Sequence, residues 1–289
     1  FDETMRAWAQ ARLRMENDLR WSLEREQLDV CYQPIVSLDR GELLGFEALV
    51  RWDHPEQSFV PPELFIPVAE ETGMILALGT YVLRRACRQM RAWMEDSPDD
   101  EPLLISVNVS GKQLAHSGFP DLVAEVLRET GLPARGLRLE ITESAIVENA
   151  DSAAEILRKL REMGVGIWLD DFGTGHASFS YLYRFPIETL KIDRSFIQQL
   201  DASGSSSEIT RTIVLLAHSL GLNVIGEGVE SFGQRDQLRD FGCDSVQGFL
   251  YSPPLAAGAA GELLSARRRL PHVTAAGFEQ AWPSAEEAG

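Results

Sequence analysis

The sequence predicts an α/β protein, a (β/α)8 TIM-like barrel in which the first two strands form an antiparallel pair. Eight short β-rich runs alternate with amphipathic segments of helical periodicity between residues 28 and 270, which is the pattern of strands separated by covering helices. Only Ser37–Gly41 joins the first two runs, whereas a parallel crossover needs about a dozen residues. These two strands are therefore expected to form a hairpin, so that one strand of the barrel is reversed.

The expected elements follow one another along the whole barrel segment. The strands are Asp29–Val36, Leu43–Trp52, Leu103–Val109, Leu137–Ile141, Val165–Asp171, Leu190–Asp193, Asn223–Glu227 and Ser245–Leu250. Amphipathic helical segments between them are Asp121–Thr130, Ser152–Met163, Ile209–Leu220 and Gln234–Phe241.

The chain divides into three segments. Residues 1–27 are charged and favour a helix, with one apolar face at three-to-four-residue spacing that comprises Met5, Trp8, Met15, Leu19 and Leu23. Two interpretations stay open for this helix: packing on its own domain, or connection to an upstream signalling domain. Residues 28–270 form the barrel, and residues 271–289, rich in Ala and Glu, form a peripheral tail.

The composition excludes several classes of protein. Lys and Arg number 27 against 44 Asp and Glu, a formal charge of -17, so duplex nucleic acid is not an expected partner. Three scattered cysteines and the absence of a membrane-spanning run favour a cytoplasmic domain. Because the chain begins at Phe1 without a signal peptide, we expect a segment of a longer protein, whose membrane tethering stays open.

Polar residues interrupt or end the predicted strands, most of them near the carboxyl end, which is the catalytic rim of such a barrel. They are Glu47, Asn108, Glu140, Asp170, Asp171, Lys191, Glu227 and Gln247. The height of Glu47 on the barrel is not easily placed, because its strand follows the hairpin. Each residue alone also fits a cap, a turn or a surface position. Together, five acids on one rim would repel one another without counter-charge.

Divalent cations usually neutralise the mutual repulsion of such a cluster of carboxylates. Its oxygen ligands suit Mg²⁺ or Mn²⁺. The five histidines are dispersed, which argues against zinc. Two metal ions would support hydrolysis of a phosphoester. A barrel enzyme that acts on an enolate, with Lys191 as the base, is the chemical alternative at this point.

Nine short motifs occur in a fixed order between about residues 28 and 255. They are Tyr32–Val36, Glu47–Trp52, Phe65–Glu70, Val107–Ser110, Leu139–Glu143, Asp170–Gly175, Leu190–Asp193, Glu227–Glu230 and Gln247–Phe249. With these motifs the sequence resembles the EAL phosphodiesterase family. The resemblance implies a barrel with an antiparallel first strand pair, the substrate cyclic di-GMP and the linear product pGpG, in bacterial second-messenger signalling.

The resemblance also implies a role for each site residue. Two cations, Mg²⁺ or Mn²⁺, would be held by Glu47, Asn108, Glu140, Asp170, Asp171 and Glu227. Asp170 would bridge the two ions. Lys191 would orient or help deprotonate the attacking water, so that the catalytic residues are Lys191, Glu47, Asp171 and Glu227. The substrate-binding residues would be Gln33, Leu49, Arg51, Asn108 and Gln247, with Arg51 on phosphate.

Glu143 would brace the loop Phe172–Ser180, and the resemblance implies a homodimer through this loop and the following helix. Phe179, Tyr181 and Tyr183 offer aromatic surface there, although core packing is an equal alternative. The chain departs from the family pattern at several positions outside the metal and water ligands, namely Trp168, His176, Ala177, Phe179, Ile225, Gly226 and Phe249. Because of the altered loop, a receptor module that binds cyclic di-GMP without hydrolysing it is the alternative to the hydrolase.

Overall fold

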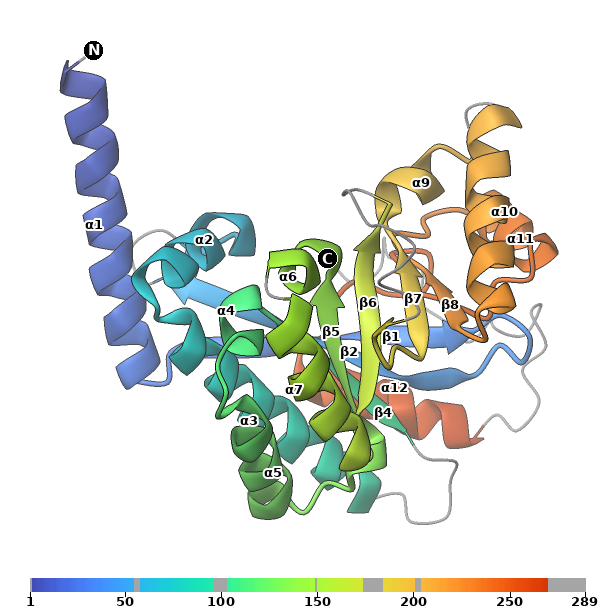
Figure 1. The fold of residues 1–289 in the computed structure, drawn as a ribbon, viewed down its shortest axis with the longest axis horizontal. Helices are drawn as coiled ribbons and strands as arrows, with labels where there is room; N and C mark the ends of the chain where they lie inside the picture. Colours follow the sequence, from blue (N-terminus) through green and yellow to red (C-terminus); the bar gives the residue numbers. More distant parts are fainter. Residues whose placement is uncertain are drawn as a thin grey trace.

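Eight strands close into a barrel with helices outside it (Figure 1). The computed structural model describes residues 2–54, 58–95, 103–148, 150–173, 184–200 and 204–269. The strands are β1 (Leu28–Ser37), β2 (Leu43–His54), β4 (Leu104–Val109), β5 (Leu137–Thr142), β6 (Gly166–Phe172), β7 (Thr189–Ile192), β8 (Asn223–Gly226) and β9 (Ser245–Val246). Their order is β1-β9-β8-β7-β6-β5-β4-β2, and pairing of β1 with β2 closes the ring. The predicted fold class is confirmed.

The reversed strand is β1, as the short hairpin connection predicted. It pairs antiparallel with β2 and with β9, while every other neighbouring pair of the ring is parallel. The hairpin register places Gln33 opposite Glu47. The antiparallel pair thus brings two chemically important side chains to the same level of the barrel wall.

Two strand expectations differ from the structure. A short strand, β3 (Ser58–Val60), extends the end of β2 as a second hairpin; three residues are too few to show a strand periodicity. The last strand was expected to reach Leu250, but β9 ends at Val246. After it the chain turns towards Val229, whose carbonyl accepts from the Leu250 N–H at 2.9 Å. Only glycine fits this turn at position 248, since a Cβ there would lie 2.2 Å from Val229 backbone atoms.

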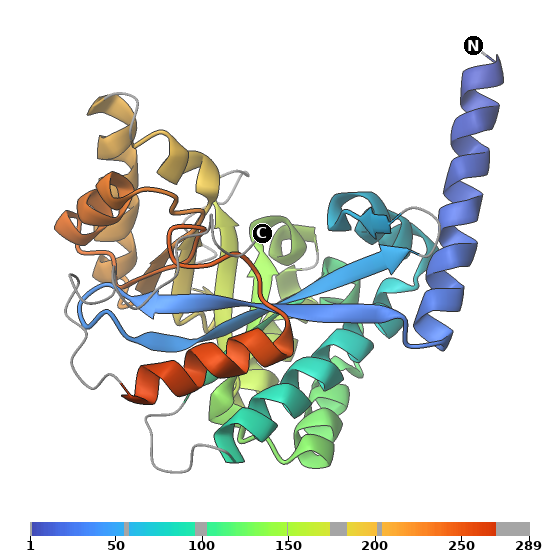
Figure 2. The same ribbon diagram turned by 180° about the vertical axis from the view of Figure 1, so that it is seen from behind.

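The helices cover the outside of the barrel (Figures 1 and 2). The four predicted helical segments correspond to α5 (Phe119–Thr130), α7 (Ala150–Glu162), α10 (Gly204–Ser219) and α11 (Phe232–Asp240). The other helices of the described residues are α1 (Asp2–Glu24), α2 (Pro62–Thr72), α3 (Ile75–Glu95), α4 (Gly111–Leu114), α6 (Glu143–Glu148), α9 (Arg194–Gln198) and α12 (Ala257–Arg269), with a 3-10 turn at Ala134–Gly136.

Local sequence explains where these helices begin and end. In α5 a proline occupies the first turn, where its missing N–H costs nothing, and Gly131 ends the helix in the left-handed conformation, at φ 70°. In α3 buried apolar residues recur on one face, Leu78, Val82, Ala86 and Met90 among them, and pack towards the barrel.

Most of the hydrophobic core lies between the barrel wall and the helices, but a second, separate cluster contains Ile35, Trp168 and Ile225. Each of these residues is two positions from a polar residue of the predicted site: Gln33 and Asp170 on the same strands, and Glu227 directly after β8. Because residues two apart on a strand share a face, this cluster lies inside the barrel, beneath the site. We call this interior cluster of Ile35, Trp168 and Ile225 the floor of the site. Trp168, one of the departures from the family pattern, is its largest side chain.

The helix α1 lies in the segment for which a connector was predicted, and its connecting role stays a prediction. The predicted tail, residues 271–289, lies outside the described residues. Within the described ranges, no helix combines the length and the apolar character that a membrane crossing requires.

Removing the indole of Trp168 tests whether the floor supports the barrel. Trp168 is 3% exposed, so Trp168→Ala should lower the free energy of unfolding by about 3–5 kcal/mol through the cavity it leaves. Trp21, which is 55% exposed, is the matched control, and Trp21→Ala should cost less than about 1 kcal/mol. Urea denaturation measures both. Equal costs for the two variants would contradict the placement of Trp168 in an interior core.

Candidate metal and substrate site

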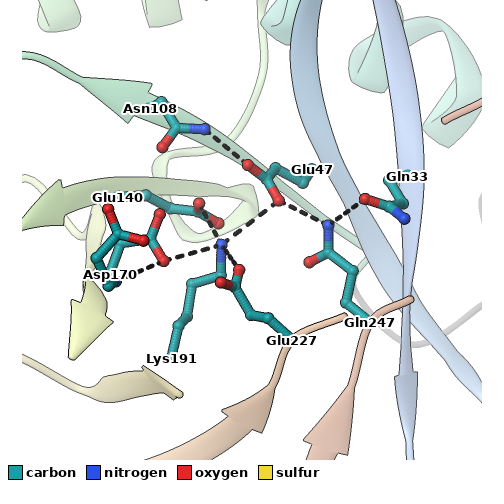
Figure 3. A network of polar contacts seen from close by, with 9 residues as sticks. Gln33, Glu47, Asn108, Glu140, Asp170, Lys191, Glu227 and Gln247 are labelled. Atoms are coloured by element: carbon teal, nitrogen blue, oxygen red, sulfur yellow. Dashed lines mark hydrogen bonds and ion pairs between the residues drawn. The ribbon is translucent and has the colours of Figure 1, made fainter. Parts of the chain in front are cut away.

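Polar side chains from separate strands converge at the carboxyl-terminal rim of the barrel (Figure 3). Seven elements supply them. Glu47 comes from β2, Asn108 from β4, Glu140 from β5, Asp170 and Asp171 from β6, Lys191 from β7, Glu227 from the residue after β8 and Gln247 from the residue after β9. All the metal, water and amide positions predicted from the sequence are therefore brought to one rim.

The strand register explains the convergence. Asn108 pairs with Glu140, and Glu47 pairs with Ser106, which is two residues before Asn108 on the same face of β4. The Asn108 amide donates to Glu47 Oε1 at 2.7 Å. This contact places Glu47, whose height could not be predicted, within the site.

The ammonium of Lys191 lies at the centre of four carboxylates (Figure 3). Its Nζ is 2.6 Å from Glu140 Oε2 and 2.6 Å from Glu227 Oε1. It is also 3.4 Å from Glu47 Oε2 and 3.5 Å from Asp170 Oδ1. The Lys191 side chain is 0% exposed, so its ammonium is fully buried among these carboxylates.

Burial and mutual charge shift the ionisation of this cluster. Burial opposes the charge of Lys191, but the surrounding carboxylates, Asp170 and Glu140 foremost, hold its pKa well above its ordinary value. Burial raises the pKa of Glu140 well above the usual range, and the neighbouring Glu47 adds to the effect. Burial also raises the pKa of Glu227 to about 8, against the opposing influence of Lys191.

Glu47 is the exception among the buried acids. Burial opposes its ionisation, yet the Lys191 ammonium and hydrogen bonds from Gln247 and Asn108 outweigh burial and hold the pKa of Glu47 below its ordinary value. Glu47 is thus the carboxylate that remains charged most readily. Its negative charge is stabilised by the Lys191 ammonium and by two amide hydrogen-bond donors.

One ammonium does not neutralise this many carboxylates. Asp170, Asp171 and Glu227 can each offer an oxygen within 4.8 Å of the others, and the buried Oε1 atom of Glu140 has no hydrogen-bond partner in the described part of the chain. Buried polar atoms are normally satisfied. Carboxylate and amide oxygens are the ligands that Mg²⁺ and Mn²⁺ prefer. The donor set therefore fits divalent cations.

The backbone of β6 departs from regular strand geometry at the paired acids. Neighbouring side chains on a regular strand point to opposite faces, but Asp171 has a φ of 54° and the β6–β7 register shifts between Leu169 and Phe172. The Asp171 N–H donates to Asp170 Oδ1 at 3.0 Å. A left-handed residue other than glycine costs about 1–3 kcal/mol. This distortion lets two consecutive carboxylates serve one site.

A chain of amides connects the acidic cluster to β1. Gln247 Nε2 donates to Glu47 Oε2 at 2.6 Å and to Gln33 Oε1 at 2.9 Å, and Gln33 Nε2 donates to the Ser252 carbonyl at 3.2 Å. Ser252 was not foreseen, because it acts through its backbone and leaves no signal in the sequence. Ser106, in register with Glu47, was also missed; its hydroxyl is buried and has no hydrogen-bond partner within the described ranges.

The other predicted substrate residues, Leu49 and Arg51, follow Glu47 at two-residue intervals and so share its face of β2. Both are half-buried. Arg51 Nη1 donates to the Val50 carbonyl at 2.9 Å. The structure thus places a guanidinium on the strand and face that carry Glu47, which is where an anionic ligand of the site would need one.

The predicted loop brace is only partly described. Glu143 is the first residue of α6 and is buried, and neither of its carboxylate oxygens has a hydrogen-bond partner among the described residues. Residues 174–183 lie outside the described ranges, and with them His176, Ala177, Phe179, Tyr181 and Tyr183. The bracing role and the dimer contact therefore stay predictions.

Comparisons with known proteins agree on one family. A sequence profile of the EAL domain matches residues 16–254. The bifunctional diguanylate cyclase/cyclic di-GMP phosphodiesterase MucR of Pseudomonas aeruginosa is 44% identical over 257 residues, which are 89% of this chain and 37% of that protein. The cyclic di-GMP phosphodiesterase NbdA of the same organism is 43% identical over 93% of this chain and 34% of that protein. The chain thus spans about a third of the length of these curated relatives.

A solved structure described as the PaMucR phosphodiesterase in complex with c-di-GMP has the same fold. It superposes with a TM-score of 0.82 at 44% sequence identity, and the match covers 86% of this chain and 99% of that one.

Replacing the central cation tests the charge balance of the site. Lys191→Met keeps the length of the side chain but leaves buried carboxylates unpaired, which should lower the free energy of unfolding in the presence of a chelator by about 3–5 kcal/mol. Millimolar Mn²⁺ should restore much of the loss, because a cation that binds only the folded state stabilises it. Urea denaturation with and without Mn²⁺ measures this, with Lys159→Met, in an exposed pair with Glu155, as the surface control. A Lys191→Met variant as stable as wild type in chelator would contradict the assigned ion pairs.

Proposed function

The chain belongs to the EAL domain family, and on that premise we propose that it hydrolyses cyclic di-GMP to linear pGpG with two divalent cations, Mg²⁺ or Mn²⁺. The observation that carries the proposal is the complete set of acids around Lys191 at one rim. Relatives with this domain are described as cyclic di-GMP phosphodiesterases, and a solved relative is described as a complex with c-di-GMP.

We assign the metal ligands from the cluster. Glu47, Asn108, Glu140 and Asp170 would hold one ion, and Asp170, Asp171 and Glu227 the other. When bound, such ions polarise the phosphate, lower the pKa of water and stabilise the leaving oxygen. They also let a dianionic substrate enter a rim that is otherwise strongly negative.

The protein residues position the reactants. In the proposed reaction a water oxygen bonds to one phosphorus, the bond from that phosphorus to the 3′ oxygen breaks, and the freed oxygen takes a proton. The Lys191 ammonium, held by carboxylates on several sides, would orient the attacking water. In the protein alone the surrounding carboxylates hold the pKa of Lys191 well above its ordinary value, so that its ammonium is a hydrogen-bond donor.

Substrate recognition is assigned to β1, β2 and the amide chain. Arg51 would grip a phosphate in a bidentate manner, and Leu49 would contact the dinucleotide. Gln33 and Gln247, ordered by their mutual hydrogen bond, would face the ligand beside Glu47. The buried Gln247 Oε1, which has no hydrogen-bond partner among the described residues, is an acceptor available to a ligand or a water.

Two parts of the proposal concern partners. We propose a homodimer through the loop after Asp171 and the helix that follows it, a region largely outside the described residues. We also propose an upstream signalling domain joined through α1. The greater length of the curated relatives supports the second proposal.

One experiment separates hydrolysis from the alternative, a receptor that binds cyclic di-GMP without cutting it. Cyclic di-GMP is incubated with the protein and Mn²⁺, and the products are separated by chromatography. Conversion to pGpG that stops on addition of a chelator supports the hydrolase. Binding without any pGpG would support the receptor.

Metal identity should separate binding from turnover. Mg²⁺ or Mn²⁺ should support conversion to pGpG, whereas Ca²⁺ should permit binding with little hydrolysis. The longer and looser coordination of Ca²⁺ should leave the water and the phosphate out of alignment. Initial rates in each metal, with affinities from calorimetry, measure this. Equal turnover in Ca²⁺ and Mg²⁺ would contradict the two-metal proposal.

Two substitutions should have opposite effects on chemistry and binding. Lys191→Met should lower kcat by about two orders of magnitude or more, with little change in affinity for cyclic di-GMP in Ca²⁺. Arg51→Met should chiefly weaken binding, as the loss of a bidentate phosphate contact would. Rates and calorimetric affinities are measured on both variants. Near-normal turnover of Lys191→Met would exclude its assigned role.

A further inference from the structure

The helix α1 contacts the end of β2 through two polar pairs. The indole N–H of Trp52 donates to the Ser22 hydroxyl at 3.0 Å, and both side chains are buried, at 1% and 3% exposure. One turn earlier on α1, Asp18 Oδ2 lies 3.3 Å from Nε2 of the buried His54. Between these two residues Leu19 is fully buried in the main core. The carboxyl half of α1 is therefore packed into the domain.

The end of β2 that α1 contacts is continuous with the substrate-binding part of the strand. Glu47, Leu49 and Arg51 occupy one face of β2, and Trp52 follows Arg51 directly on the opposite face. Trp52 also packs edge-on against His54 and Phe65, with ring centroids 5.3 and 5.4 Å apart. A shift of the Trp52 ring would be transmitted to the backbone that positions the Arg51 guanidinium.

A second set of contacts leads from α1 towards Asn108. The helix α2 packs against α1, to which it is tied by an ion pair between Glu71 and Arg12. The Glu70 carbonyl on α2 accepts from Lys112 Nζ at 2.5 Å. Lys112 belongs to α4, whose cap, Ser110, follows Asn108 by two residues. The two strands reached from α1 are the two whose side chains meet in the Asn108–Glu47 hydrogen bond.

We propose that α1 sets the position of the substrate-binding edge of the site, and that Ser22 and Asp18 are positioning residues that act through Trp52 and His54. The inference rests on the proposed function for its ligand, cyclic di-GMP. Ser22 and Asp18 contact β2 beyond Arg51, at Trp52 and His54, and neither contacts a carboxylate of the cluster. Movement of α1 would therefore alter substrate affinity more than the chemical step.

Ser22→Ala is the direct test, because it removes the acceptor and leaves the buried Trp52 N–H unpaired. Amide hydrogen exchange along residues 47–54 should become faster, and the affinity for cyclic di-GMP in Ca²⁺ should fall roughly fivefold or more, while kcat in Mn²⁺ changes less than twofold. Ser22→Thr, which keeps the hydroxyl, should restore both properties. Asp18→Asn should also make exchange along residues 47–54 faster and affinity weaker. Because Asp18 is partly exposed, this change should have little effect on the free energy of unfolding.

Asp244→Ala is the matched structural control. Asp244 Oδ2 accepts from the Val224 N–H at 2.7 Å and lies 3.0 Å from Nε2 of His218 on α10. The helix α10 lies on the side of the barrel opposite α1 (Figures 1 and 2). Asp244→Ala should lower the free energy of unfolding without changing amide hydrogen exchange along residues 47–54 or the affinity for cyclic di-GMP.

The inference is overturned if Ser22→Ala and Asp18→Asn leave exchange along residues 47–54 unchanged, whether or not cyclic di-GMP binds. It is equally overturned if they shift affinity no more than Asp244→Ala does. Failure of the wild type to bind cyclic di-GMP would instead count against the proposed function, and the exchange measurement would still decide the inference.

Discussion

The Lys191 ammonium contacts four buried carboxylates at once, and the remainder of the site is arranged around that charge balance. A buried lysine stays charged only where nearby acids offset its desolvation. The same acids are too many for one lysine, so the cluster retains capacity for further positive charge. The ion pairs of Lys191 and the proposed binding of divalent cations thus follow from one arrangement of carboxylates. The fold tolerates these buried acids because the Lys191 ammonium and bound cations can both supply positive charge.

The reversed strand β1 makes this arrangement possible. In a barrel of parallel strands only the carboxyl ends would face the rim, but the β1–β2 hairpin sets Gln33 across from Glu47 in mid-strand. Gln247, beyond β9, can then donate to both side chains. The wall that carries the proposed substrate residues is therefore linked by hydrogen bonds to the wall that carries the proposed metal ligands. The end of this hairpin is also the point at which α1 is attached.

The sequence was sufficient for the barrel, the reversed strand and the set of residues at the rim, because loop length and polar residues at strand ends are local signals. The height of Glu47 was not predictable, since it depends on the β2–β4 register, a contact between distant segments. The positive φ of Asp171 and the bulge beside it were also hidden, because an Asp-Asp pair carries no sign of its backbone geometry. The short β3 and the contact of α1 with Trp52 arise only when distant segments pack together.

We propose that the carboxylates around Lys191 are a site for two divalent cations. Anomalous X-ray scattering from crystals grown with Mn²⁺ and an uncleaved dinucleotide tests it directly. We expect two Mn²⁺ peaks, one near Glu47, Asn108 and Glu140 and one near Asp171 and Glu227, with Asp170 between them. A map without Mn²⁺ at this rim, in which the Lys191 ammonium still contacts all four carboxylates, would contradict it.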